Sequence, residues 1–259
     1  MVGSRRTSAL NARVDRERRF HDARFSDGIG ARDQDKYYPA LFAARAALDY
    51  AITQCAALGT TGLEVGCGTG QNLAELLSQH RFAAHGIDIS REAVAAARKR
   101  LVEFDPAPTL DVMDANQLSY ENETFDFCFG SGVLHHLSLP SALHELSRVL
   151  KPGGRILFLE PLATNPLIQA YRHLTPSARS PDETPLTRSH LRQIEETFPD
   201  VRFEYFGFST LTCVGLMRWP NAAQAALRVA SDLDRFLLRL PFVWRVAWVV
   251  LIRGQRAQP

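Results

Sequence analysis

The sequence has little lysine, and its charge favours neither sign. Lys36, Lys99 and Lys151 are its lysines, so arginine supplies nearly all of the positive charge. The 30 basic and 28 acidic side chains leave a formal charge of +2. A protein that binds by neutralising many phosphates needs a larger basic excess. The balance therefore predicts no nucleic-acid partner, and the hydrophobic content of 46% predicts an ordinary folded chain.

Cysteine is also scarce, and its spacing carries no metal signature. The sequence contains neither a CxxC pair nor the clustered histidines that suggest a zinc site, so we expect no metal. Scattered cysteines favour a reducing cytoplasm. They are Cys55, Cys67, Cys128 and Cys213.

Long apolar runs are missing as well. A membrane-spanning helix needs about 20 apolar residues. The longest apolar stretch, residues 240–252, is shorter and is interrupted by Pro241 and Arg245. The N-terminus is rich in arginine but lacks the apolar core of a secretory signal. We therefore expect a cytoplasmic protein that does not span a membrane.

Between residues 62 and 160 the sequence alternates short apolar runs with amphipathic stretches. This βαβα order predicts a parallel sheet covered by helices on both faces. A polar arm (1–35) and a helix (36–54) precede it. The predicted strands are 62–65, 83–88, 109–114, 125–132 and 155–160; the predicted helices lie around 73–77 and over 92–104 and 141–150, and a turn is predicted at 151–154.

After Glu160 the rhythm changes. Five prolines within residues 161–186 exclude a long regular helix and predict an insertion near the functional face. A helix (187–198) and a strand (201–208) follow. Within a second insertion, 209–247, residues 221–239 predict an amphipathic helix whose core face carries Leu227, Ala230, Leu233, Leu237 and Leu240. The tail, 248–254, is apolar and β-branched enough to be the last strand.

Residues 63–70 read LEVGCGTG and predict a ligand-binding loop. Glycine lets the backbone turn sharply and approach a ligand closely. The GxGxG spacing differs from the GxGxxG of dinucleotide sites. Asp88 follows Gly66 by 22 residues, at the end of the second strand, where a carboxylate can accept both hydroxyls of a ribose. Together they predict an adenosine-bearing ligand without phosphates, whereas the loop alone is also typical of a tight turn.

Five motifs in order resemble those of the class I S-adenosylmethionine-dependent methyltransferases, in the small-molecule, methyltransferase type 11-like group. The resemblance implies an α/β, Rossmann-like fold with helices on both faces of a seven-stranded sheet of order 3-2-1-4-5-7-6, the last strand antiparallel. It implies S-adenosyl-L-methionine as cofactor, one domain over 40–259, and an arm or lid over 1–39. The motifs are LEVGCGTG (63–70), GIDIS (86–90), DVMDANQLSYENETFDF (111–127), GSGVLHHL (130–137) and RVLKPGGRILFLEP (148–161).

Carried over by position, the resemblance implies a cofactor site around these motifs. Glu64 would lie under the methionine portion, Asp88 would bind the ribose, and Asp114 would accept from the adenine amine. Alternatively, Glu64 and Asp114 are ordinary surface or capping carboxylates, and Cys67 is a small hydrophobic residue. The predicted set is Tyr38, Glu64, Gly66, Cys67, Gly68, Gly70, Asn72, Asp88, Ile89, Asp114, Ala115 and Gly130.

The arm also resembles the segment that folds over the cofactor in many of these enzymes. Tyr37, Tyr38 and His21 are candidates to close the site. The alternative is that the tyrosines begin the first packed helix. The arginines of the arm are typical of a solvated segment. They are Arg5, Arg6, Arg13, Arg16, Arg18 and Arg19.

Methyl transfer from a sulfonium is an in-line displacement, so positioning should dominate, and a general base would add to it. His135 and His136, just beyond the fourth strand, are the first candidates for that base, and Glu160, at the end of the fifth strand, is the next. The alternative is that both histidines serve packing or capping.

The two insertions, residues 161–186 and 209–247, indicate the class of methyl acceptor. Their aromatic and aliphatic residues predict an apolar pocket for a small hydrophobic or amphipathic acceptor such as a natural product, lipid, quinone or terpenoid. Tryptophan beside arginine within 218–252 also suits peripheral contact with a membrane or lipid. A macromolecular methyltransferase and a non-enzymatic partner subunit remain as alternatives. The residues expected to form the apolar pocket are Tyr171, Phe208, Leu216, Met217, Trp219, Phe236, Phe242, Trp244 and Trp248.

Overall fold

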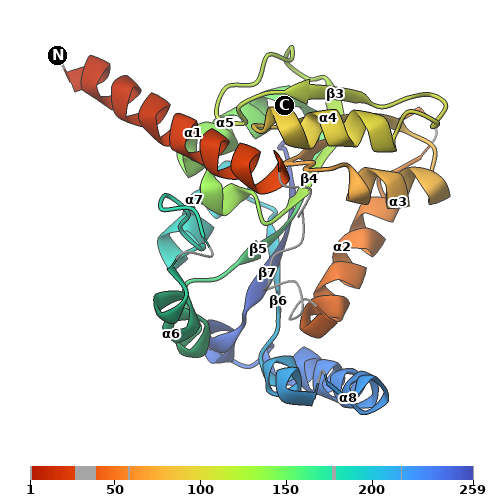
Figure 1. Ribbon diagram of the computed structural model, residues 1–259, viewed down its shortest axis with the longest axis vertical. Helices are drawn as coiled ribbons and strands as arrows, with labels where there is room; N and C mark the ends of the chain where they lie inside the picture. The colour runs from red at the N-terminus through yellow and green to blue at the C-terminus, as the bar shows by residue number, and fades with distance from the viewer. Residues whose placement is uncertain (1, 27–38, 58, 177–178, 217, 259) are drawn as a thin grey trace.

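A single sheet of seven strands runs through the protein (Figure 1). The computed structural model describes residues 2–26, 39–57, 59–176, 179–216 and 218–258. The strands are β1 Thr61–Val65, β2 Ala83–Asp88, β3 Thr109–Val112, β4 Phe125–Ser131, β5 Leu150–Pro161, β6 Arg202–Phe206 and β7 Val249–Gln255. Their order is β3-β2-β1-β4-β5-β7-β6, and β7 is antiparallel to both neighbours. The predicted sheet is confirmed.

Helices cover both faces of the sheet. The α-helices after the arm are α2 Phe42–Thr53, α3 Gln71–Gln79, α4 Arg91–Arg100, α5 Leu139–Val149, α6 Pro166–Leu174, α7 Arg188–Thr197 and α8 Pro220–Leu237; short 3-10 helices are η2 Leu134–His136, η4 Ser209–Leu216 and η5 Val243–Val246. Phe127 and Phe129 of β4 pack with α2, α3 and α4, whereas Cys128 packs on the opposite face with α5 and α7. This alternation is the side-chain period of a buried strand.

Capping residues explain where several helices begin. The hydroxyl of Ser90 accepts from the backbone N–H of Ala93 (3.2 Å) at the start of α4. Asn165 caps α6 in the same way, and Thr187 caps α7. An N-cap of this kind satisfies a backbone donor that the helix itself leaves unpaired. Asn165 therefore places a short helix within the proline-rich segment.

The N-terminal arm is a helix, α1 (Val2–Ser26), that is docked onto the body. At its C-terminal end, Asp22 accepts from the hydroxyl of Ser90 (2.6 Å) and from the backbone N–H of Arg91 (3.0 Å). Arg16 pairs with Asp182 (2.7 Å), and Arg13 donates to the carbonyls of His136 and Asp182. The prediction of a solvated arm is therefore wrong for Arg13, whereas Arg16 remains 52% exposed although it pairs with Asp182.

Two further predictions need correction. Residues 151–154 do not form a separate turn, because β5 already begins at Leu150. Gly153 lies within this strand and has a left-handed backbone conformation (φ +75°). On α8, Leu227 and Ala230 of the predicted core face are buried, but Leu233 is 46% exposed, and Leu240, beyond the end of the helix, is 41% exposed, so the predicted face is correct only in part. None of the helices within the described ranges has the length and apolarity needed to cross a bilayer.

Candidate active site

A cavity of about 800 Å³ opens at the carboxyl ends of β1, β2 and β4, which is where open α/β sheets bind ligands. Val65 and Gly66 line it from the end of β1, Asp88 from the end of β2, and Ser131 from the end of β4. Helix α1 crosses the same cavity with residues from Arg13 to Phe25. Helix α1 of the arm therefore forms part of the cavity lining.

The glycine loop closes one wall. Gly66 adopts a positive φ of 71°, which glycine tolerates and other residues avoid. A Cβ at this position would lie 2.8 Å from Cγ2 of Val133, so the close approach of the two loops also requires glycine. The loop leads into the N-terminus of α3, where backbone N–H groups have no partner within the helix.

Asp88 is fixed in place by the backbone. Its Oδ2 accepts from the N–H of Gly68 and its Oδ1 from the N–H of Ser90, both at 2.9 Å. A carboxylate has about four acceptor positions, so these two bonds leave capacity for a ligand. Asp88 and its neighbour Ile89 both line the cavity.

The predicted adenine region lies beside Asp88. Asp114, Ala115 and Asn116 line the cavity. The Oδ1 of Asp114 accepts from the backbone N–H (2.9 Å) and the side-chain amide (2.7 Å) of Asn116, which makes Asp114 a local cap as well. The surroundings of Asp114 are therefore compatible both with binding of the adenine amine and with a purely capping role.

Glu64 lies behind the cavity wall. Its side chain is fully buried, and its Oε1 accepts from the amide of Asn72 (2.8 Å), which itself accepts from Arg45. Burial raises the pKa of Glu64 to about 8, against the lowering effect of the Asn72 bond. Asn72 and Arg45 line the cavity, so Glu64 contributes to the cavity wall by holding the side chain of Asn72.

Some predicted cofactor residues lie outside the cavity lining. Cys67 is 5% exposed and packs with the helices below the loop, where burial raises the pKa of its thiol. Gly130 is needed for packing, because a Cβ there would lie 2.7 Å from the carbonyl oxygen of Val65. Ser131, Gly132 and Val133 line the cavity in its place. Gly70 is likewise absent from the lining, and Tyr38 lies outside the described residues.

His135 and Glu160 form a buried pair at the other end of the cavity. The Nδ1 of His135 is 2.8 Å from Oε2 of Glu160, whose side chain is fully buried. The Oε1 of Glu160 accepts from the backbone N–H groups of Val133 (2.8 Å) and Leu134 (2.9 Å). Burial raises the pKa of Glu160 to about 7, although these bonds oppose the rise. Only His135 of the pair lines the cavity.

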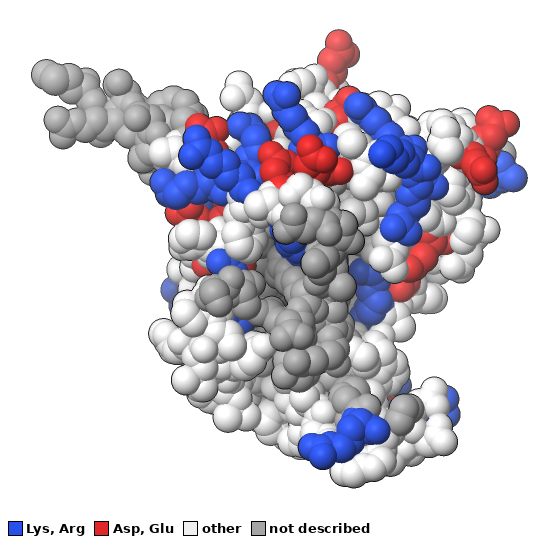
Figure 2. Space-filling view, viewed as in Figure 1, with Lys and Arg blue, Asp and Glu red and all other residues white. Residues whose placement is uncertain are grey.

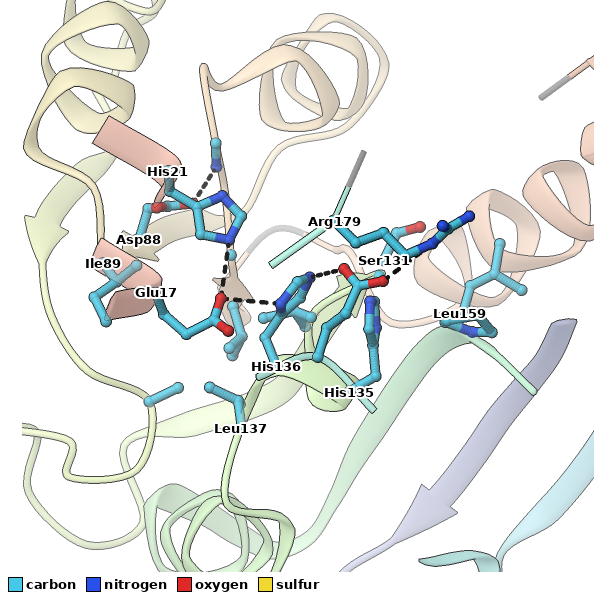
Figure 3. Close-up of a pocket in the computed structure, with 18 of the residues that line it drawn as sticks. Glu17, His21, Asp88, Ile89, Ser131, His135, His136, Leu137, Leu159 and Arg179 are labelled. Carbon is cyan, nitrogen blue, oxygen red and sulfur yellow. Dashed lines mark hydrogen bonds and ion pairs between the residues drawn. The ribbon is translucent and has the colours of Figure 1, made fainter. Parts of the chain in front are cut away.

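His136 is held by the arm (Figure 3). Its Nδ1 lies 3.1 Å from Oε2 of Glu17, which also lies 3.5 Å from Nε2 of His21. Burial, and then the neighbouring His135, lower the pKa of His136 to about 4, so it is neutral at pH 7. Burial also raises the pKa of Glu17, but hydrogen bonds from His136, His21 and Ser180 outweigh it and hold that pKa below its usual value. An ionised Glu17 thus links α1 to η2.

Glu183 completes this end of the cavity. Its Oε1 pairs with Arg172 (2.8 Å) and Arg179 (3.4 Å), and its Oε2 lies 3.8 Å from Nε2 of His136. Two groups here have the donor atoms of a metal site: Glu17, His21 and His136, and His135, His136 and Glu183. Both carboxylates already have other protein partners, since Ser180 donates to Glu17 and Arg172 and Arg179 neutralise Glu183.

Comparison with known proteins identifies the fold. Residues 63–158 match the family model described as "Methyltransferase domain". The chain is 36% identical over 110 residues to a phosphatidylethanolamine N-methyltransferase of Cereibacter sphaeroides, covering 41% of this chain and 53% of that one. It is 36% identical over 103 residues to the ubiquinone/menaquinone biosynthesis C-methyltransferase UbiE of Bartonella henselae, covering 38% and 40%.

A solved structure extends the likeness across the fold. The geranyl diphosphate C-methyltransferase of Streptomyces coelicolor A3(2) superposes with a TM-score of 0.60 and 14% identity, over 83% of this chain and 79% of that one. Residues 63–158 therefore form a class I S-adenosylmethionine-dependent methyltransferase domain. The chain spans about half, or less, of the length of these curated relatives.

The end of the cavity that contains His135, His136 and Glu183 differs from the prediction for the acceptor pocket. Of the nine residues expected to form an apolar pocket, Tyr171 and Trp248 line the cavity. Met217 lies outside the described residues, and the others lie elsewhere. The lining is instead rich in polar side chains from α1, η2 and residues 171–183. The prediction that these residues form the acceptor pocket is therefore wrong for the six described residues that do not line this cavity, because the C-terminal elements use them elsewhere.

Sequence reasoning also missed several residues of this methyltransferase site. Glu17, Glu183, Arg172 and Arg179 were not predicted, although the arm was expected to cover the site and His21 was named. One local signal was available for Glu17, because Glu17 and His21 are spaced i, i+4 and lie on one face of a helix. No local pattern joins residue 17 to residues 136 and 180.

Proposed function

We propose that the protein transfers a methyl group from S-adenosyl-L-methionine to a small-molecule acceptor. One observation carries the proposal: a single cavity joins Asp88 and the glycine loop to the buried His135–Glu160 pair. The first set of residues suits an adenosine, and the second suits proton transfer. Family membership supports the cofactor, since the family is S-adenosylmethionine-dependent.

The reaction needs alignment and one proton acceptor. The bond between sulfur and the methyl carbon breaks as the bond from the acceptor atom to that carbon forms. The acceptor's proton goes to His135, and S-adenosylhomocysteine and the methylated acceptor leave. Alignment of two bound reactants supplies about 7–11 kcal/mol in favourable cases, and a positioned base adds about 10²–10⁴-fold.

Glu160 is a positioning residue in this proposal. When ionised it accepts from Nδ1–H of His135, which leaves Nε2 as the basic nitrogen. Its pKa of about 7 predicts that turnover rises as pH increases through neutrality. His136 is the weaker candidate for the base, because its pKa of about 4 leaves little driving force for taking a proton.

The acceptor carries a polar or ionisable group in this proposal. Arg172, Arg179 and Glu183 line the cavity near the histidines, whereas Ile168, Tyr171 and Trp248 offer apolar surface. An amphipathic small molecule matches both. The curated relatives named above are methyltransferases whose names refer to a phospholipid and to quinone biosynthesis, which supports this class.

The first test is binding and transfer with the whole chain. Calorimetry with S-adenosylhomocysteine should give a stoichiometric complex. Incubation with S-adenosylmethionine and a panel of phosphatidylethanolamine, a polyprenylated quinol and geranyl diphosphate, read by mass spectrometry, should give a product heavier by one methylene. If calorimetry showed no binding of S-adenosylhomocysteine, the proposal of methyl transfer would be overturned.

Variants then separate the base from the cofactor site. His135→Ala should lower kcat by about 10²–10⁴-fold with the affinity for S-adenosylhomocysteine unchanged. Glu160→Gln should lower kcat less and remove the rise with pH near neutrality. His144→Ala, an exposed histidine on α5, is the matched control. Full turnover by His135→Ala would exclude this histidine as the base.

A further inference from the structure

Helix α8 carries two apolar stripes, and one of them has no partner among the described residues. The inner stripe packs against the body, with Ala223, Leu227 and Ala230 each at most 8% exposed. The outer stripe consists of Val229, Leu233 and Phe236, which are 71%, 46% and 67% exposed. Their spacing of four and three residues puts them on one helix face. A helix that only covered a core would have a polar face here.

The outer stripe continues beyond the end of the helix. Leu240 and Phe242 follow it and are 41% and 66% exposed. Phe242 has a positive φ of 69°, which is unfavourable for a bulky side chain. The fold therefore holds this ring outward against a local backbone preference. Strain of this kind clusters at ligand-binding and switch regions, which points to a partner for the exposed ring.

Arginines surround the stripe. Arg228, Arg235 and Arg239 follow one side of α8 and its C-terminal turn, and all three are exposed. At the two ends, Arg218 lies 5.1 Å from the ring of Trp219, and Arg245 lies 4.9 Å from the ring of Phe242. Figure 2 shows this mixture of white and blue at the lower end of the molecule, where Figure 1 draws α8.

Acidic residues do not balance these arginines. Within residues 218–245 the acidic residues are Asp232 and Asp234. Asp232 pairs with Arg235 (3.2 Å), and Asp234 is 3% exposed and accepts from the backbone N–H groups of Phe208 and Ser209. The exposed surface is therefore apolar along its centre and positive along its side.

We propose that the outer stripe of α8, with Leu240 and Phe242, docks into the surface of an anionic lipid bilayer. A helix with exposed aromatic and aliphatic side chains flanked by arginine lies in the membrane interface, where the apolar face enters the acyl boundary and arginine meets lipid phosphate. A second copy of the chain fits less well, because a two-fold contact through the stripe brings the same arginines together. The proposal does not depend on methyl transfer.

Vesicle flotation with the full chain tests the proposal. Binding should be strong to vesicles of equimolar phosphatidylcholine and phosphatidylglycerol and weak to phosphatidylcholine alone. Phe236→Ser should weaken binding by about tenfold or more, since a buried phenylalanine is worth at least that factor. Val229→Ser has a matched control in Val102→Ser, because both valines are 71% exposed and Val102 follows α4. Circular dichroism verifies that each variant is folded.

Charge and self-association are tested separately. Arg228→Gln and Arg239→Gln should each weaken binding to anionic vesicles by about fivefold. Equal binding to both vesicle types, or no binding to either, would overturn the proposal. So would a stable dimer in light scattering that Phe236→Ser dissociates, because the stripe would then bind a second copy. Neither measurement uses turnover, so failure here leaves the proposed methyl transfer standing.

Discussion

The two ends of the cavity are built in different ways. At the cofactor end, Gly66, Asp88 and Asp114 come from consecutive strand ends and are fixed largely by backbone hydrogen bonds. At the acceptor end, Glu17, His136 and Glu183 come from three distant segments and are fixed by each other. The positions of residues in a site fixed by the backbone can be predicted from a short motif. A site fixed by side-chain contacts instead depends on how distant segments of the chain come together in the fold.

The largest effect is expected at the cofactor end, from Asp88→Ala. The variant loses the proposed ribose acceptor and also leaves the N–H groups of Gly68 and Ser90 without their partner. The affinity for S-adenosylhomocysteine, measured by calorimetry, should fall by at least about 100-fold, because two charge-assisted hydrogen bonds are worth that much.

Asp111→Ala is the control for that experiment. Asp111 belongs to the neighbouring strand β3, accepts from the hydroxyl of Tyr120 (3.3 Å), and does not line the cavity. Its loss should leave the affinity unchanged. If Asp88→Ala kept the affinity within threefold of the parent, the adenosine would have to bind elsewhere. The description of the cofactor end as a site built around Asp88 would then be wrong.

The same contrast explains what the sequence could predict. The strands and helices between residues 62 and 160 follow from short apolar runs and amphipathic stretches, and Asp88 follows from its distance to the glycine loop; these are local signals. The strand order and the positions of Ile89 and Asp114 are implied by the resemblance of five short motifs to the methyltransferase family. The pairing of Glu17 with His136 spans 119 residues. Nothing near either residue encodes it.

The C-terminal region shows a second limit of sequence reasoning. The sequence predicts a helix at 221–239, which is α8, but it predicts the buried face only in part, because α8 has apolar residues on two sides and periodicity alone cannot say which side packs. Leu233 was therefore assigned to the core although it is exposed. The choice is made by η4 and β6, which contact α8 after folding.

Behind the cofactor end, Glu64→Gln should change how stability depends on pH. Burial raises the pKa of Glu64 from 4.5 to about 8 in the folded protein. Between these values the folded state holds a proton that the unfolded state has lost, so stability is fully present below pH 4.5 and falls as pH rises. The slope reaches about 1.4 kcal/mol per pH unit, and glutamine removes it.

Urea denaturation between about pH 5 and pH 8 measures this slope. The difference in unfolding free energy between Glu64→Gln and the parent should grow in favour of the variant as pH rises. Glu92→Gln, which changes an exposed carboxylate on α4, should run parallel to the parent. Parallel curves for Glu64→Gln as well would mean that Glu64 is ionised in the folded protein.

The smallest of these effects is expected at the acceptor end, from Glu17→Ala. This change leaves His136, His21 and Ser180 without the carboxylate they share, while Arg16–Asp182 and Asp22 still hold α1. Loss of charged hydrogen bonds should speed amide exchange in α1 by about three- to tenfold. Hydrogen exchange read by mass spectrometry measures it.

Asp15→Ala is the matched control, because Asp15 is on the same helix but pairs with exposed Arg18 (3.0 Å) and should have little effect. The pKa of Glu17 is lowered, so its contribution to docking of the arm is fully present above about pH 4.5 and is lost progressively as pH falls below that value. Exchange in the parent should therefore approach that of Glu17→Ala in acid. If the two variants exchanged equally at neutral pH, side-chain contacts would not be what holds the acceptor end together.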